Sequence, residues 1–286
     1  MEHGYQVTDR KRCIVLPFRS GTRNEQATAG LALHFLLGNV LALHRDLQEF
    51  WFGWRVAKIF PGFAEFSAYC RSVGPGLDLE EASRQQNLRY WVSGVCRPEG
   101  IRMQLFDALA LEGSSSADIA FSCEDDLIGF RSAFLDWFGR CTGRPFPGSQ
   151  LSAALWPEIL TRPGLESVGA ALSAFYRFSF AGDQGGGIEL RVFEKAVDTA
   201  PDSFMANNLL GWALYRDQKA GDAAACFRRA LDLNPSGAGA MAGLMWCAFQ
   251  AGDRASSVSW AGRKAAVCGQ DVEAAKTKAA KRFETA

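Results

Sequence analysis

The C-terminal part of the chain has a hydrophobic pattern that repeats every 34 residues. Two segments place apolar residues at the same distances before a proline: Phe193, Ala196 and Pro201, then Phe227, Ala230 and Pro235. Large aromatic residues at Phe178, Trp212 and Trp246 follow the same period. Such a period is typical of stacked helix-turn-helix repeats, in which each repeat buries its apolar face only against its neighbours. The pattern predicts an all-α repeat domain over residues 165–286.

The most regular copy of the repeat runs from Leu210 to Pro235. Its small and large apolar residues stand at fixed places: Leu210, Gly211, Leu214, Ala223, Phe227, Ala230 and Pro235. This arrangement resembles the tetratricopeptide repeat family, in which small residues stand where two helices cross closely and large residues fill the gaps between hairpins. Asn234-Pro235 ends the second helix, because the residue before a proline is disfavoured in the α region.

The flanking copies are less regular, as is common for terminal repeats. Several positions depart from the pattern: Arg177, Glu189, Met245, Ser257 and Lys264. A last helix is predicted near residues 271–283, with one apolar stripe formed by Val272, Ala275, Ala279 and Phe283. Lysines occupy its other faces, so we expect this helix to act as a solubilising cap.

The resemblance also implies a binding surface. In that family the first helices of the hairpins line a concave face that holds a protein partner. Carried over to this sequence, the face comprises Phe178, Met205, Asn208, Trp212, Tyr215, Arg216, Trp246, Phe249 and Gln250. Aromatic residues of this kind are enriched at protein interfaces. The pattern by which some family members bind a C-terminal carboxylate is absent. An alternative stays open, in which the aromatic row packs against the N-terminal domain or the last helix.

The N-terminal part alternates between strand and helix patterns. The predicted order is β-α-β-α-β-β-β-α, with strands at 12–18, 50–57, 88–97, 101–107 and 117–122, and helices at 26–44, 79–84 and 127–141. The strand-helix-strand opening implies a right-handed parallel crossover. Residues 88–107 form the clearest hairpin, with a turn at 98–100. These elements predict an α/β domain with a mixed sheet over residues 12–141.

Short motifs in this domain resemble the TolB amino-terminal-like domain of bacteria. They are Ile14-Val15-Leu16-Pro17-Phe18, Ala29-Gly30-Leu31, Leu88-Arg89-Tyr90 and Ser93-Gly94-Val95. In that family the domain often precedes tetratricopeptide repeats and follows an adenylate cyclase or winged-helix domain. Only about eleven residues precede the first strand here, so we expect the accessory half of a bacterial signalling protein. Residues 142–164 are interpreted as a turn-rich linker with a docking helix near 151–160.

The length and composition of the chain support two globular domains and limit the classes of partner that it can bind. The chain has 286 residues, 48% of them hydrophobic, and 31 basic residues balance 31 acidic ones. The balanced charge does not favour nucleic acid binding. No secretory signal or stretch of roughly 20 apolar residues occurs, so we expect no membrane insertion. Eight scattered cysteines without paired spacing indicate a reduced, cytoplasmic location.

The sequence offers little for catalysis. The three histidines, His3, His34 and His44, are poorly placed for a nucleophile, and the glycine clusters lack the residues of a phosphate loop. The acidic residues at 80–81 are most simply explained as the solvated face of a helix, and those at 124–126 as the start of a helix. We therefore predict no catalytic or metal site and no cofactor, and rank an enzyme last.

Two functions remain from the sequence. The first is a non-enzymatic adaptor or scaffold that binds a protein or peptide through the repeat surface. The second is a small-ligand sensor, in which the turn and helix start at Ser20 to Gly30 hold an anion with free backbone N–H groups.

Overall fold

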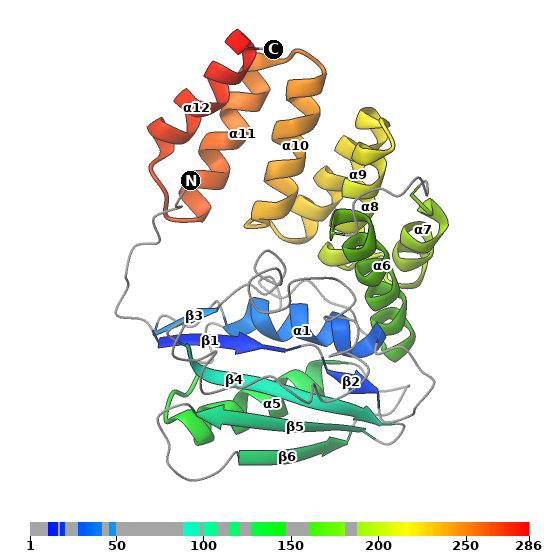
Figure 1. Ribbon diagram of the computed structural model, residues 1–286, viewed down its shortest axis with the longest axis vertical. Helices are drawn as coiled ribbons and strands as arrows, with labels where there is room; N and C mark the ends of the chain where they lie inside the picture. Colours follow the sequence, from blue (N-terminus) through cyan, green and yellow to red (C-terminus); the bar gives the residue numbers. More distant parts are fainter. Residues whose placement is uncertain are drawn as a thin grey trace. The chain divides into compact units, whose positions relative to one another are not determined.

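The computed structural model describes residues 11–16, 18–20, 28–41, 46–49, 88–97, 100–107, 115–120, 127–146, 161–180 and 188–285. The chain divides into two compact units, Met1–Leu151 and Ser152–Ala286. The first unit contains strands and helices, and the second contains helices in its described part (Figure 1). The predicted fold class, an α/β domain followed by an all-α helical repeat domain, is confirmed.

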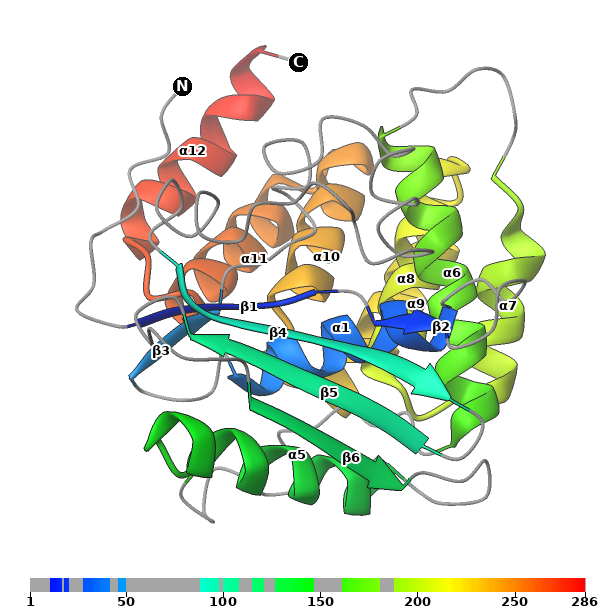
Figure 2. The same ribbon diagram turned by 60° about the horizontal axis from the view of Figure 1, so that its bottom comes forward.

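A mixed sheet forms the centre of the first unit (Figure 2). Its strands are β1 (Lys11–Val15), β2 (Arg19–Ser20), β3 (Leu47–Glu49), β4 (Leu88–Arg97), β5 (Gly100–Asp107) and β6 (Ser115–Ala120). The order is β3-β1-β4-β5-β6, and β2 also pairs with β4. β1 runs parallel to β3 and β4, whereas β4, β5 and β6 run antiparallel to one another. The described residues of this unit also form the helices α1 (Thr28–Leu41) and α5 (Leu127–Thr142).

Most predicted elements of this unit are present with shifted ends. The hairpin is confirmed as β4 and β5, paired from Tyr90 with Asp107 to Arg97 with Gly100. β6 begins two residues before the predicted strand, and α1 is described over Thr28–Leu41, within the predicted helix at 26–44. The structure has a strand at β3 that the sequence did not predict, because Gln48 and Glu49 give it no apolar alternation. The predicted strand 50–57 and the helices at 79–84 and 151–160 lie outside the described residues.

Burial along β4 and β5 explains why these segments are strands. On β5, Ile101, Met103 and Leu105 are buried while Gln104 is exposed, which is the alternation of a half-buried strand. On β4, three consecutive residues are buried: Tyr90, Trp91 and Val92. Such a run is typical of a central strand whose two faces are both covered.

The start of α1 lies unusually close to the chain at Phe18. The Phe18 backbone N–H donates a hydrogen bond to the Gly30 carbonyl over 3.1 Å, and the Phe18 side chain is fully buried. A Cβ atom at Gly30 would lie 1.8 Å from the Phe18 carbonyl oxygen. Only glycine leaves room for this contact, which gives the Ala29-Gly30-Leu31 motif a steric cause.

His34 is a buried titratable group in α1. Its side chain is 1% exposed, and its Nδ1 atom lies 2.6 Å from the Val15 carbonyl oxygen of β1. Burial lowers the pKa of His34 from 6.5 to about 4, although the bond to Val15 acts in the opposite direction. The ring is therefore neutral at pH 7 and joins α1 to the sheet as a hydrogen-bonding core residue.

The second unit is built from helical hairpins. Its helices are α6 (Arg162–Phe180), α7 (Leu190–Thr199), α8 (Phe204–Arg216), α9 (Ala220–Leu233), α10 (Ala238–Gln250), α11 (Arg254–Val267) and α12 (Val272–Thr285). The helices α8, α10 and α12 begin at 204, 238 and 272, so the 34-residue period is preserved through α12. The predicted last helix is confirmed as α12, with Ala279 buried and Val272, Ala275 and Phe283 half-buried on its stripe.

The helices pack in the alternating manner expected of a repeat array. First helices contact each other, α6 with α8 and α8 with α10. Second helices pack against the first helix of the next hairpin, α7 with α8, α9 with α10 and α11 with α12. The first helices α6, α8 and α10 therefore form one continuous layer, and the surface that this layer presents is shared by successive repeats.

Phe227 of α9 joins two successive hairpins. Its ring is fully buried in a cluster that includes Leu214, Ala230, Met241 and Leu244. Added Cβ atoms at Gly211 of α8 and Gly243 of α10 would lie 2.7 and 2.3 Å from the Phe227 ring, respectively. The ring thus fits only because two glycines flank it. This contact fixes the spacing between α8, α9 and α10.

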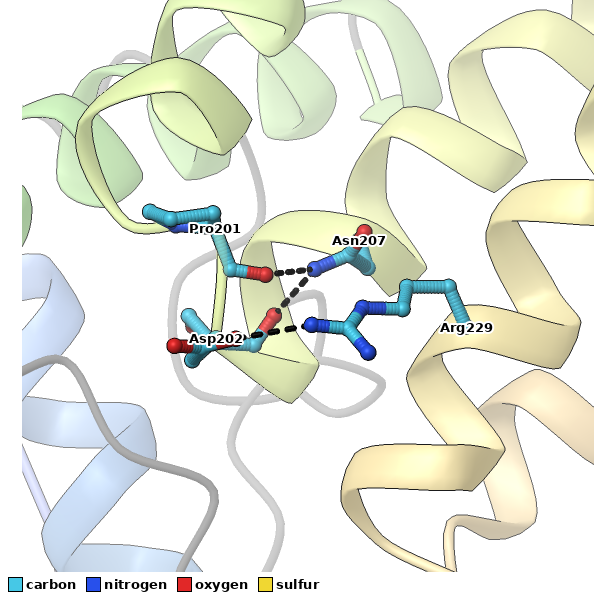
Figure 3. A network of polar contacts seen from close by, with 5 residues as sticks. Pro201, Asp202, Asn207 and Arg229 are labelled. Atoms are coloured by element: carbon cyan, nitrogen blue, oxygen red, sulfur yellow. Dashed lines mark hydrogen bonds and ion pairs between the residues drawn. The ribbon is translucent and has the colours of Figure 1, made fainter.

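The turn between α7 and α8 is held by polar contacts (Figure 3). The buried Asn207 side chain donates from Nδ2 to the carbonyl oxygens of Pro201 and Ser203, each over 2.9 Å. Ser203 caps α8 by accepting a hydrogen bond from the Ala206 backbone N–H. At the surface, Arg229 of α9 pairs with Asp202 over 2.7 Å. Together these contacts set the direction in which α8 leaves the turn.

We predict that lowering the pH weakens the first unit through His34. Its pKa is lower in the folded chain than in the unfolded one, so the unfolded chain binds the proton first as the pH falls below 6.5. The free energy of unfolding should fall by about 2 kcal/mol between pH 7 and pH 5 because of this group. Urea titration of the chain and of His34→Gln should show a weaker pH dependence in the variant. Identical pH profiles would contradict this role.

We predict that Asn207→Ala lowers the free energy of unfolding by about 1–3 kcal/mol, because the turn loses two hydrogen bonds of a buried side chain and the Ser203 carbonyl keeps only the backbone N–H of residue 207. The matched control is Arg229→Ala, which removes only an exposed ion pair at the same turn and should cost at most about 1 kcal/mol. Chemical denaturation measures both values. Equal losses in the two variants would show that Asn207 does not hold the turn.

Candidate functional site

The residues predicted to bind a partner belong to three first helices. α8 carries Met205, Asn208, Trp212, Tyr215 and Arg216, and α10 carries Trp246, Phe249 and Gln250. Phe178 falls in α6, but its side chain lies outside the described residues. Since α6, α8 and α10 pack successively, the array brings the remaining residues onto neighbouring helices.

Met205 lies in the core of the array rather than on its surface. Its side chain is 5% exposed, and its neighbours Ala206 and Asn207 are also buried. α8 contacts α6, α7, α9 and α10, so a helix with other helices on most sides buries residues at nearly every position. The prediction placed Met205 on the concave face, whereas close packing of the helices buries its side chain.

Trp212 and Tyr215 form the first aromatic pair, on α8. Their ring centroids lie 5.9 Å apart with an interplanar angle of 86°, an edge-to-face contact. Trp212 also contacts Phe227 edge-to-face at 5.3 Å, so the core supports one side of its ring. Both side chains are half-buried. Burial raises the pKa of Tyr215, so its phenol stays neutral at pH 7.

Trp246 and Phe249 form the second aromatic pair, on α10, with nearly the same geometry. Their centroids lie 5.8 Å apart at 89°. Here the last helix covers the pair. The Arg282 guanidinium of α12 lies 4.5 Å from the Trp246 centroid, and the Phe283 ring lies 4.8 Å from Phe249. These contacts place the second pair under α12.

The aromatic row thus has different surroundings in its two described repeats. The pair on α10 packs against the last helix, as the alternative proposed. For the pair on α8, the described aromatic contacts of Trp212 are those with Tyr215 and Phe227, and both rings of the pair also pack against the core that α8 shares with α9 and α10. Sequence reasoning found the apolar stripe that contains Phe283. It missed Arg282, because a basic residue in a lysine-rich helix gives no signal of ring stacking.

Polar groups surround the aromatic pairs. Arg216 and Gln250 are exposed at the ends of α8 and α10, and the Gln250 amide donates to the Gln218 side chain over 2.9 Å. Asn208 lies one turn before Trp212 and packs beside Gly239 of α10. Its Oδ1 atom is buried and accepts no hydrogen bond in the structure. The surface therefore combines aromatic rings with polar side chains, and an unsatisfied amide acceptor lies buried beside them.

The described residues offer little for a reaction. No three His, Cys, Asp or Glu side chains among them lie together in a way that could hold a metal ion. Burial raises the pKa of the Cys247 thiol to about 11, which keeps it protonated and unreactive. No described helix has the length and hydropathy of a membrane span. Most of the predicted anion-binding turn, residues 21–27, lies outside the described residues.

Comparison with known proteins agrees with the repeat geometry. A family model described as tetratricopeptide repeat matches residues 190–238 and 210–270. The two overlapping matches extend from α7 to α11 and include both aromatic pairs. No curated protein matches the chain. The TolB-like resemblance of residues 12–141 receives no support from these comparisons. Tetratricopeptide repeats generally mediate protein–protein interaction, and the C-terminal part of this chain carries such a repeat region.

Proposed function

We propose that the chain is a non-enzymatic adaptor that binds a protein or peptide partner through the first helices of its repeat array. The observation that carries this proposal is the pair Trp212 and Tyr215, whose rings pack on one side against the core that α8 shares with α9 and α10 and stay partly exposed. Aromatic side chains that are supported from one side by a packed core resemble the anchors of protein interfaces.

The geometry supports binding more than it supports turnover. Trp212 is fixed by Tyr215 and Phe227, so a partner that contacts it does not have to order a mobile side chain. Asn208, Arg216 and Gln250 supply polar and charged groups near the rings, as at the rim of an interface. Rigid aromatic residues with a polar rim provide affinity and orientation without any acid–base chemistry.

The setting of this adaptor is also a proposal. The resemblance of residues 12–141 to the TolB amino-terminal-like domain favours a bacterial signalling or assembly complex, with a cytoplasmic location. The balanced charge of 31 basic and 31 acidic residues favours a protein partner over a nucleic acid. The domain limits 12–141, 142–164 and 165–286 belong to the same proposal.

We predict that Trp212→Ala reduces capture of the partner at least about tenfold, because truncating an anchor tryptophan commonly costs 2 kcal/mol or more of binding free energy. The measurement is quantitative mass spectrometry of proteins retained from a lysate of the source organism by the immobilised chain. Trp212 is preferred to Trp246, because replacing Trp246 would also remove the support of α12.

Trp260→Ala is the matched control. Trp260 lies on the second helix α11, and Arg263 already covers its ring at 4.3 Å. The control should retain the captured proteins, and thermal unfolding should show that both variants fold. Equal retention by wild type, Trp212→Ala and Trp260→Ala would contradict the adaptor proposal.

A further inference from the structure

The two aromatic pairs are equivalent positions of the repeat with different surroundings. Each consists of a tryptophan and an aromatic residue three positions later, in edge-to-face contact at 5.9 Å on α8 and 5.8 Å on α10. Trp212 and Trp246 are 34 residues apart, as are the starts of their helices. The side chain that covers the pair on α10 therefore indicates which kind of ligand the pair on α8 can bind.

The pair on α10 binds an arginine of the same chain. The Arg282 guanidinium lies 4.5 Å from the Trp246 centroid, and its Nη1 atom approaches the Met245 sulfur at 3.6 Å. A guanidinium stacks well on an indole, because it is planar, weakly hydrated and attracted by the electrons of the ring. This contact shows that a tryptophan and aromatic pair at this position of the repeat can bind an arginine side chain.

The pair on α8 lacks this cover. α12 begins 34 residues after α10, so the residue of α10 in register with Arg282 is Ala248. At this position α10 has the methyl side chain of alanine, where α12 has the guanidinium group of arginine. Among the residues that the structure describes, no cation lies over the Trp212 ring, whose contacts are with Tyr215 and Phe227.

We propose that Trp212 binds an arginine side chain of the protein partner, stacked on the indole as Arg282 stacks on Trp246. This inference rests on the proposed adaptor function and specifies its partner, a segment that presents an arginine next to apolar residues. The surface on α8 is thus a cation-binding aromatic site, and its counterpart on α10 is the same site already occupied by α12.

Asn208 supplies a feature that the occupied site lacks. It is one turn before Trp212, and its register equivalent on α10 is Ala242. Its Oδ1 atom is buried without a hydrogen-bond donor, an unfavourable state that a ligand N–H would relieve. Gly239 lies beside this amide, and an added Cβ atom there would lie 3.3 Å from the Asn208 Nδ2 atom. A guanidinium stacked on Trp212 has N–H donors to spare for this acceptor.

The test uses the full chain and a labelled peptide with the sequence of residues 271–285, which contains the arginine that the structure already shows on a tryptophan. Fluorescence anisotropy measures its affinity. We expect Trp212→Ala to weaken binding about tenfold, and replacing the peptide arginine by glutamine to do the same. Combining both changes should cost little more than either alone, because they remove one contact.

Two further variants sharpen the result. Ala248→Arg places the chain's own arginine in register with Arg282 and should abolish peptide binding, whereas Ala248→Gln should not. The inference is overturned if the peptide does not bind, if glutamine replaces its arginine without loss, or if Trp212→Ala binds it as wild type does. If the peptide test fails in one of these ways but capture of the partner still depends on Trp212, the adaptor function stands without the arginine. If capture does not depend on Trp212 either, both the adaptor function and the arginine inference are wrong.

Discussion

Phe227 between two glycines is the contact on which the repeat array depends. The ring belongs to the second helix of one hairpin and reaches the first helices of its own and the next hairpin, where Gly211 and Gly243 give it room. A larger residue at either glycine would push the helices apart, and a smaller residue at 227 would leave a cavity. The spacing of α8 and α10, and with it the placement of the aromatic pairs, follows from this packing.

The polar turn at Asn207 complements that apolar contact. Packing around Phe227 sets the distance between helices, and the hydrogen bonds of Asn207 to Pro201 and Ser203 set the entry of α8. The next repeat has Met241 and Gly237 at the equivalent places of Asn207 and Ser203, so its turn is held differently. The core of the array therefore repeats between hairpins, whereas the turns that connect the hairpins are held by different contacts.

The sequence predicted much of the fold and less of the surface. Periodicity located the hairpins, α12 and the β4–β5 pair, because burial of one face leaves a direct pattern in the residues. It failed for β3, where pairing with β1 imposes a strand on residues without apolar alternation. It also failed for Met205 and Arg282. Whether a residue at a surface position is covered depends on neighbouring helices, and a single helix pattern does not contain that information.

The anchoring of α12 differs from that of the helices before it. α8 has seven buried residues and α10 has six, whereas α12 has one, Ala279. Local opening requires least free energy where least apolar surface is buried. Opening of α12 should consequently require less free energy than opening of α8 or α10. Each such opening would uncover the indole of Trp246, so exposure of this ring depends on a local equilibrium of one helix.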